Sequence, residues 1–495
     1  MIGILSFPVL LGLIFLRVPI GLAMFLAGLV GLIIVTDGTH LPFARLKSET
    51  FGTFSSYSLS IIPMFLLMGH FATLGGMSQA LFKAAESFLG HRKGGVAMAA
   101  IGACAGFGAI CGSSLATAAT MSRVALPEMR KYGYSGGFST ATLAAGGTLG
   151  ILIPPSVVLV IYAILTEQNI AKLFLAAFIP GVLAALGYVI VISIYVRLYP
   201  KDAGITRERI GYAARLRALI DVWPVLIIFS LVVGGIYLGW FTPTEGAAVG
   251  ALGTGVIAWV NGGLTRATLG ESFVVTARAT AMIFFIVLGA AFYNGFLALT
   301  QVPQEIAMWV GNQGFSPWLV MLVILVFYLL LGCLMDSLSM ILLTIPIFWP
   351  VILGLDFGMV TLAELHADRA LAALAQGVDL APEMLSGIQA VLADGVELTR
   401  EQIRALGLRG VSEVSLNRIN TERVAIWFGI LVLIVVEVGL ITPPVGMNLF
   451  IINAIDRKTP MVETYKAVLF FVASDIVRIA LLFLFPAITL VLIPW

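Results

Sequence analysis

The chain has 495 residues, of which 60% are hydrophobic and only 11% are charged, and its formal net charge is +2. A soluble fold would need a core too large for its surface, so this composition predicts an all-α polytopic membrane protein embedded in a lipid bilayer. The small net charge does not indicate nucleic-acid binding. The three cysteines lie in apolar runs, without the spacing of a disulfide framework or a metal site.

The first three apolar runs are expected to be membrane spans. Residues 5–16 and 20–35 are short and are separated by Arg17-Val18-Pro19, which predicts either a bent hairpin or two tilted spans. The first run lacks a basic region and an obvious cleavage site, so we interpret it as a retained span rather than a signal peptide. A third span is expected at 59–74, and an amphipathic interfacial arm at 78–93.

Residues 96–121 are apolar but too short to cross a bilayer twice. Basic residues flank both ends, with Arg92 and Lys93 before the segment and Arg123 after it. Both flanks are therefore expected on the cytoplasmic side. A segment that enters and leaves on one side is a re-entrant hairpin, and its tip is predicted at residues 112–114.

One interrupted apolar segment occurs twice. Residues 138–166 contain Gly150 and the pair Pro154-Pro155, and residues 424–455 contain the same pattern at Gly439 and Pro443-Pro444. Proline removes a backbone donor and clashes with the preceding turn, so neither helix can continue unbroken. In a bilayer, broken helices persist only where protein or a water-filled cavity satisfies the freed backbone groups. Two matched interruptions indicate the binding site of a secondary transporter.

A return span at 173–195 leads into a basic stretch at 197–221, which predicts a cytoplasmic connector between two halves, residues 1–196 and 222–495. The second half repeats the order of the first. Its expected elements are spans at 222–240 and 245–260, an arm at 262–278, a span at 281–299, a hairpin at 318–353 with a polar tip at 335–339, the broken helix at 424–455, and a last span at 468–494.

The spacing between the halves locates an insertion. Ser337 follows Ser114 by 223 residues, whereas Gly439 follows Gly150 by 289, a difference of 289 − 223 = 66 residues. The polar stretch 356–423, with amphipathic pieces, accounts for the difference as a small helical insertion. Counting crossings predicts two inverted-topology repeats, about ten to twelve spans in all, and a periplasmic insertion with few basic residues.

Four motifs resemble those of the large membrane subunit (DctM type) of TRAP transporters, and they occur in family order over nearly the whole chain. They are Gly106–Thr120 with Pro127-Glu128-Met129, Gly239–Glu245, Met335–Met340 and Glu437–Gly446. The insertion at 356–423 departs from the family pattern, where a short turn is usual.

This resemblance implies a sodium-coupled importer of organic acid anions, of the dicarboxylate, sialic acid or sugar-acid class, with an elevator-type mechanism of the wider ion-transporter superfamily. It implies a multi-pass protein of the bacterial inner membrane with two partners, a small TRAP membrane subunit and a periplasmic substrate-binding protein. Because no small subunit precedes Met1, that subunit is expected as a separate chain. The alternative is a self-sufficient sodium/carboxylate transporter that needs no binding protein.

Sodium prefers hard oxygen ligands, which hairpin tips and interrupted helices supply as hydroxyls and unwound carbonyls, while helix N-termini suit a carboxylate. In the first half the predicted sodium ligands are Gly112, Ser113, Ser114, Thr117, Gly146, Gly147, Thr148 and Pro154. In the second half they are Asp336, Ser337, Ser339, Thr442 and Pro443. Predicted substrate contacts are Ser113, Pro155, Ser156, Asp336, Pro444 and Asn448. The alternative is that the small residues only let helices pack closely.

Ionisable residues inside apolar segments are functional hypotheses by default. Asp336 is the strongest, although an aspartate also caps helices well. Glu437 precedes the second interruption and either orients it or is structural, and Asp475 and Arg478 are expected to form a structural ion pair. No phosphate-binding loop, His-Glu-x-x-His motif or Gly-x-Ser-x-Gly elbow is present. We therefore expect neither an ATP-driven pump nor an enzyme, and no cofactor besides sodium as coupling ion.

Overall fold

The computed structural model describes residues 2–206, 208–375, 378, 381–393, 398–408 and 413–493. Within these ranges the backbone is almost entirely helical. Up to the connector the helices are α1 (Ile2–Phe15), α2 (Ile20–Thr36), α3 (His40–Phe54), α4 (Ile61–Leu74), α5 (Met77–Leu89), α6 (Gly95–Cys111), α7 (Ser114–Lys131), α8 (Gly136–Leu152), α9 (Val157–Thr166), α10 (Ile170–Leu198) and α11 (Tyr212–Ile220).

Further helices follow the connector. These helices are α12 (Trp223–Phe229), α13 (Gly235–Tyr237), α14 (Pro243–Val260), α15 (Arg266–Leu299), α16 (Val302–Asn312), α17 (Pro317–Gly332), α18 (Ser337–Leu353), α19 (Leu362–Ala375), α20 (Pro382–Ala393), α21 (Arg400–Ala405), α22 (Glu413–Gly439), α23 (Met447–Ile455), α24 (Met461–Leu484) and α25 (Ala487–Leu490). A π-helical turn, Ser230–Gly234, joins α12 to α13.

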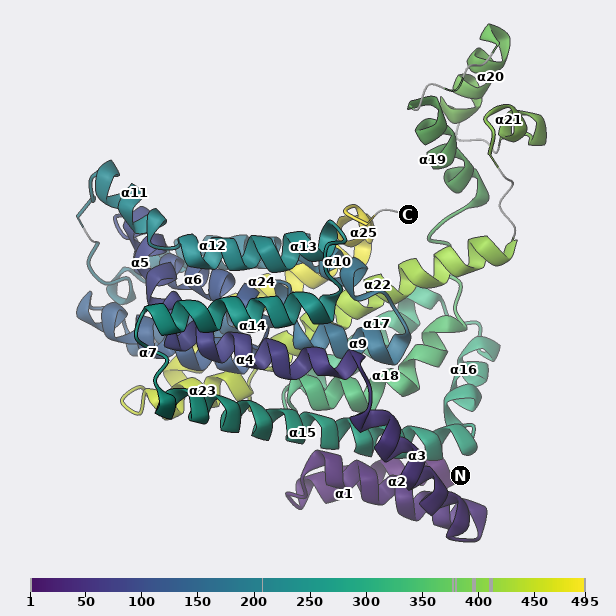
Figure 1. Cartoon of the computed structure of the whole chain (residues 1–495), viewed down its shortest axis with the longest axis horizontal. Helices are drawn as coiled ribbons and strands as arrows, with labels where there is room; N and C mark the ends of the chain where they lie inside the picture. The colour runs from purple at the N-terminus through teal and green to yellow at the C-terminus, as the bar shows by residue number, and fades with distance from the viewer. Residues whose placement is uncertain are drawn as a thin grey trace.

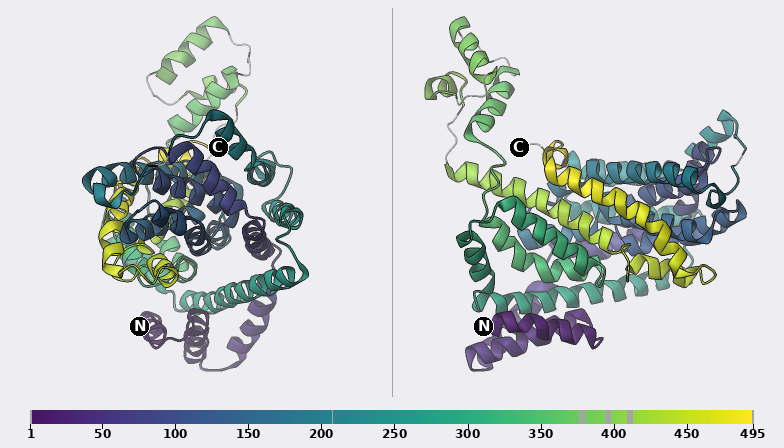
Figure 2. Two further views of the ribbon diagram at one scale, coloured as in Figure 1. Left: turned by 90° about the vertical axis from the view of Figure 1, so that its left-hand side faces the viewer. Right: turned by 180° about the vertical axis from the view of Figure 1, so that it is seen from behind.

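Two helical hairpins enter the bundle from opposite ends. The hairpin α6–α7 joins the rest of the chain at the end where α5 and α11 lie, whereas α17–α18 joins it at the end where α16 and the insertion lie (Figure 1). The hairpin tips meet in the interior. At the edge of the bundle, α1 packs on α2 and α2 packs on α15 (Figure 2).

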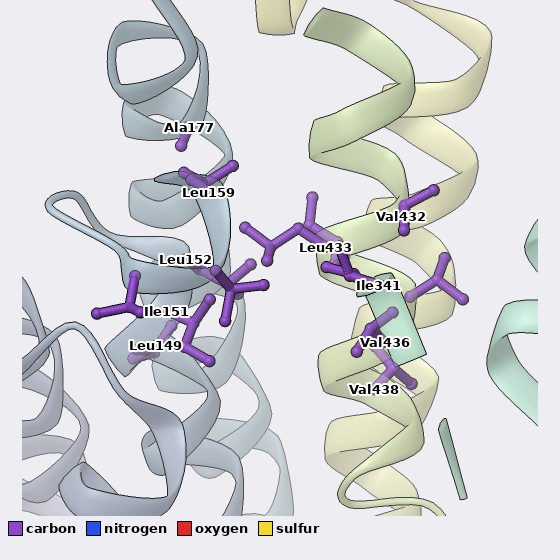
Figure 3. Packing of buried hydrophobic residues seen from close by; sticks show 14 of the residues in the cluster. Leu149, Ile151, Leu152, Leu159, Ala177, Ile341, Val432, Leu433, Val436 and Val438 are labelled. Carbon is purple, nitrogen blue, oxygen red and sulfur yellow. The ribbon is translucent and has the colours of Figure 1, made fainter. Parts of the chain in front are cut away.

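The core of the bundle is built around α8 and α22, whose central residues are buried on every side. Alternating small and aliphatic residues let α8 pack against α6, α7, α10 and α24 at once. Leu149 and Leu152 of α8 belong to the same apolar layer as Leu433 and Val436 of α22 (Figure 3). This layer joins the two interrupted helices.

Three expected boundaries differ from the structure. The first hairpin does not end at residue 121, because α7 continues to Lys131 before Gly133 turns the chain with φ +77°. The arm at 262–278 and the span at 281–299 are one 34-residue helix, α15, because no helix-breaking pair separates them. The broken helix of the second half begins at Glu413 rather than 424, so the end of the stretch 356–423 belongs to α22.

The expected polytopic helical membrane protein is confirmed by several long apolar helices. Four helices of the described ranges are long and apolar enough to cross a membrane, and up to seven spans result if each of three bent pairs is counted once. Other apolar helices are 10–17 residues long, because residues counted as full spans form hairpin arms or short helices. The four long helices are Ile170–Leu198, Arg266–Leu299, Val414–Gly439 and Met461–Leu484.

The insertion is a small helical unit of its own, formed by α19, α20 and α21, and it stands away from the bundle (Figure 1). Its own apolar cluster includes Ala370, Ile388 and Ile403 and does not merge with the main core. At the base of the insertion, the Asn420 Nδ2 donates to the Val360 carbonyl oxygen at 3.3 Å. The segments that enter and leave the insertion therefore lie side by side.

Candidate functional site

Both hairpin tips line one cavity of about 190 Å³ inside the bundle. Four elements complete its wall: α4, the end of α8, the start of α9 and the middle of α15. The lining residues are Leu66, Gly112, Ser113, Ser114, Leu115, Ile151, Val157, Val158, Ala279, Met282, Ile283, Asp336, Ser337 and Leu338. Segments more than 200 residues apart in sequence thus form one site, and five of the predicted ligands are brought together there.

The tip of the first hairpin is a tight turn. Gly112 ends α6 with φ +63°, a conformation that L side chains rarely adopt, and a Cβ there would lie 2.9 Å from the Pro155 carbonyl oxygen. Ser113 then caps α7 by accepting from the Ala116 N–H at 3.5 Å. Val157 N–H donates to the Gly112 carbonyl oxygen at 3.5 Å, which fastens the tip to the first interruption.

The tip of the second hairpin is capped by Asp336. Its Oδ2 accepts from the Ser339 N–H at 3.1 Å at the start of α18, so the capping role is confirmed. The side chain is only half-buried and also lines the cavity. A capping carboxylate has a remaining oxygen, and Asp336 is therefore able to serve both roles.

Paired glycines bring each hairpin against its own interrupted helix. A Cβ on Gly108 would lie 2.5 Å from the Gly150 Cα, and a Cβ on Gly439 would lie 2.5 Å from the Gly332 Cα. Since the obstructing atoms are backbone, no side-chain movement relieves such a contact. The two halves therefore use the same close helix approach at corresponding places.

The interruptions themselves differ in length. The Pro154–Pro155 and Pro443–Pro444 bonds are both cis. In the first interruption, α8 and α9 meet at 44°, and Ser156 caps α9 by accepting from Leu159 N–H at 3.3 Å. The second interruption spans residues 440–446, where the Thr442 hydroxyl donates to the Val438 carbonyl oxygen at 2.6 Å.

Each segment that follows an interruption packs against the other half's hairpin. Thus α9 contacts α18, and α23 contacts α7. Arg130 at the end of α7 forms an ion pair with the buried Asp456 carboxylate just after α23. The Asn448 Nδ2 of α23 donates to the Ala144 carbonyl oxygen of α8 at 3.4 Å. The hairpins and interrupted helices are therefore interlocked across the halves.

Glu437 is the polar residue that the predicted ligand sets left out. It is fully buried one turn before the second interruption, and its Oε1 accepts from the Ser337 hydroxyl at 2.8 Å. The sequence did contain one indication that Glu437 belongs to the site: a carboxylate within an apolar run, just before Pro443-Pro444. The contact with a hairpin 100 residues earlier was not visible in that signal.

A second buried polar network lies on the far side of α8. The Thr148 hydroxyl pairs with the Tyr188 hydroxyl at 3.0 Å, and the Tyr188 hydroxyl donates to Asp475 Oδ2 at 2.8 Å. Asp475 Oδ1 lies 2.8 Å from Arg478 Nη2, so the expected ion pair is confirmed. Thr148 thus has its partner in α10 rather than at the hairpin tip.

The remaining predicted residues are not among those that line the cavity. Gly146 and Gly147 face Cys104 and Ala118, where they let helices approach closely. The Thr117 hydroxyl is buried and has no hydrogen-bond partner among the described residues. Outside the lining set are Thr117, Gly146, Gly147, Thr148, Pro154, Pro155, Ser156, Ser339, Thr442, Pro443, Pro444 and Asn448.

The cavity combines three serine hydroxyls, one carboxylate and the N-termini of α7 and α18. No basic side chain occurs among the described residues that line it. Such a set suits a hard cation together with a small anion, because the oxygens attract the cation and the helix ends attract the anion.

The family described as "Tripartite ATP-independent periplasmic transporter, DctM component" matches residues 7–488. The chain is similar to the C4-dicarboxylate TRAP transporter large permease protein DctM of Pseudomonas aeruginosa, with 32% identity over 91% of this chain and 89% of the relative. It is also similar to the sialic acid TRAP transporter large permease protein SiaM of Vibrio cholerae, with 31% identity over 72% of this chain and 83% of the relative.

A similarity in fold extends to a solved structure. The Alcanivorax borkumensis YdaH transporter, whose crystal structure "reveals an unusual topology", superposes with a TM-score of 0.56 over 92% of this chain and 90% of that one. The sequence identity is 14%, so this similarity concerns the fold alone.

Proposed function

We propose a transport mechanism for this chain from one premise: it belongs to the DctM family of tripartite ATP-independent periplasmic transporters. It is accordingly a multi-pass protein of the bacterial inner membrane and a transporter permease rather than an enzyme. The finer assignment is the transport subunit of a sodium-coupled importer of organic acid anions. It would work with a small membrane subunit and a periplasmic binding protein.

The convergence of both hairpin tips on one cavity is the observation that carries the proposal. A site built from the tips of two hairpins that enter from opposite ends can be reached from either side when one tip moves. That is the requirement of alternating access. The relatives named for C4-dicarboxylate and sialic acid support an organic acid as the substrate.

The charges in the cavity support sodium coupling. An organic anion that enters beside the Asp336 carboxylate meets a like charge, and no basic residue of the lining offsets it. A sodium ion held by Asp336 and the serine hydroxyls would remove this repulsion. Sodium binding and anion binding would then each strengthen the other, which is the thermodynamic basis of symport.

An elevator-type movement fits the interlocked packing. The hairpin α6–α7 packs against α23, and the hairpin α17–α18 packs against α9. The ion pair between Arg130 and Asp456 joins the end of α7 to the chain just after α23. We assign these helices to one moving transport domain. The scaffold would be formed by the first helices of each half, where α2 packs on α15 and α4 packs on α14.

Uptake of radiolabelled organic acids into proteoliposomes tests the proposal. The chain is reconstituted with the small subunit, and the sodium gradient and the binding protein are each included or omitted. We expect uptake only when both are present. Uptake with sodium alone would favour a self-sufficient transporter, and uptake without a sodium gradient would overturn sodium coupling.

A further inference from the structure

We propose that Glu437 is a ligand of a coupling sodium ion, and that Ser114 and Ser337, one from each hairpin, contribute to the same site. This inference rests on the proposed function, because it assigns residues to the ion that drives transport. Glu437 is a carboxylate in the core of the bundle, whereas Asp336 lies at the cavity wall. The two serines would bring one ligand from each hairpin to Glu437.

The two oxygens of Glu437 are unequally satisfied. Oε1 accepts the hydrogen bond from the Ser337 hydroxyl at 2.8 Å, but Oε2 has no hydrogen-bond partner among the described residues. The side chain has no exposed surface. Burial of an ionised carboxylate with a single neutral hydrogen bond is strongly unfavourable unless a proton neutralises it or a bound cation compensates its charge.

That positive charge does not come from a neighbouring side chain. Within the described part of the chain, no lysine or arginine forms an ion pair with Glu437. The charges that act on it are Asp475 and Arg478 of α24, which have opposite signs and pair with each other at 2.8 Å. Arg478 is therefore already paired with Asp475, and we assign the charge that compensates Glu437 to a bound cation.

Ser114 supplies a second ligand from the other hairpin. It is buried, with 1% of its surface exposed, and its hydroxyl has no hydrogen-bond partner among the described residues. It lines the same cavity as Ser337, whose hydroxyl donates to Glu437 at 2.8 Å. A carboxylate oxygen and a hydroxyl oxygen, both buried and both unsatisfied, are the ligands that a hard cation prefers.

The site would couple the ion to the substrate cavity through shared residues. Ser114 and Ser337 also line the 190 Å³ cavity, so an ion that draws them toward Glu437 fixes the distance between the two tips. A cavity of defined width binds substrate better than one with mobile tips. The coupling is reciprocal, so substrate would also strengthen sodium binding at Glu437.

The test compares Glu437→Gln with Glu245→Gln as a matched control. Glutamine keeps an amide oxygen for Ser337 and removes only the charge. Glu245 is an exposed carboxylate in the capping box of α14, remote from the hairpin tips. Two quantities are measured: equilibrium binding of radiolabelled sodium to the purified protein, and the sodium concentration that gives half-maximal uptake.

We expect Glu437→Gln to weaken sodium binding at least about tenfold, the usual cost of disturbing a metal site, and Glu245→Gln to leave it unchanged. If folded Glu437→Gln binds sodium as tightly as the wild type, the assignment of Glu437 as a ligand is wrong. The proposed function still holds in that case, provided that sodium drives uptake by the wild type. Lack of any sodium dependence in the wild type defeats the proposed function itself. If Glu437→Gln does not fold, Ser337→Ala is used, with the same expected weakening.

Discussion

At the scale of single residues, the hairpin tips show how a side chain can carry both a structural and a chemical role. Asp336 caps α18 through the Ser339 N–H, which is the ordinary role of an aspartate at a helix start. It also places its charge on a cavity wall that has no basic side chain among its described residues. Capping alone explains the geometry but not why the cap is charged.

Replacement of Asp336 by asparagine separates the two roles. Asparagine caps a helix about as well as aspartate, so Asp336→Asn should fold like the wild type, whereas Asp336→Ala should lose about 1 kcal/mol of stability. If the charge holds sodium, both variants should have strongly reduced uptake. Thermal unfolding and proteoliposome uptake measure the two effects, and normal uptake by Asp336→Asn would reduce Asp336 to a cap.

The close glycine contacts make a second prediction at this scale. Gly439→Ala places a methyl group 2.5 Å from the Gly332 Cα, so the hairpin α17–α18 must shift. We expect a loss of about 1–3 kcal/mol in stability and impaired uptake. Gly270→Ala in α15 is the control, since nothing lies within 4 Å of the added Cβ. Equal stability of the two variants would contradict the role given to the glycine contact.

At the scale of elements, the sequence was most informative where a local rule applied. Pro154-Pro155 and Pro443-Pro444 interrupt their helices because proline acts within one turn, and residues 112–114 form the first tip because Gly112 and Ser113 are turn and cap residues. Long-range contacts left no such signal. The pairing of Thr148 with Tyr188, and of Glu437 with Ser337, depends on which helices become neighbours in the folded bundle.

The ion pair between Arg130 and Asp456 gives a prediction for the contact of two elements. It joins the end of α7 to the chain after α23, where Asp456 also accepts from the Thr459 hydroxyl at 2.7 Å. Arg130→Ala leaves a buried carboxylate without its cation and should lower the unfolding midpoint. Arg130→Ala combined with Asp456→Asn should recover part of the loss, with a coupling energy of about 1–2 kcal/mol. Strict additivity in this double-mutant cycle would show that the pair does not join the elements.

At the scale of the whole molecule, the chain forms a large helical bundle and a small insertion, and each has its own apolar core. The bundle has a continuous core, and the insertion has a separate cluster that includes Ala370, Ile388 and Ile403. Sequence spacing located the insertion because the two halves otherwise keep a nearly constant offset. Its extent was overestimated, since α22 begins at Glu413 and the helical pattern gave no boundary between polar and apolar turns.

The separate core predicts that the insertion can be removed without unfolding the bundle. Val360 and Asn420 are hydrogen-bonded at its base, so a short Gly-Ser linker in place of residues 362–413 can join the two ends. The shortened protein should elute as a single folded species in size-exclusion chromatography, with an unchanged unfolding midpoint. Aggregation or a large loss of stability would mean that the insertion supports the bundle.

If the cavity between the two hairpin tips is the transport site, bound sodium and substrate should protect a thiol placed on its wall. Leu338→Cys places a single cysteine on the cavity wall in a background without Cys104, Cys111 and Cys333. The rate of modification by a small thiol reagent is measured with sodium, with the transported organic acid, and with both. We expect the slowest modification when both are present. A rate that neither ligand changes would contradict the assignment of the cavity as the transport site.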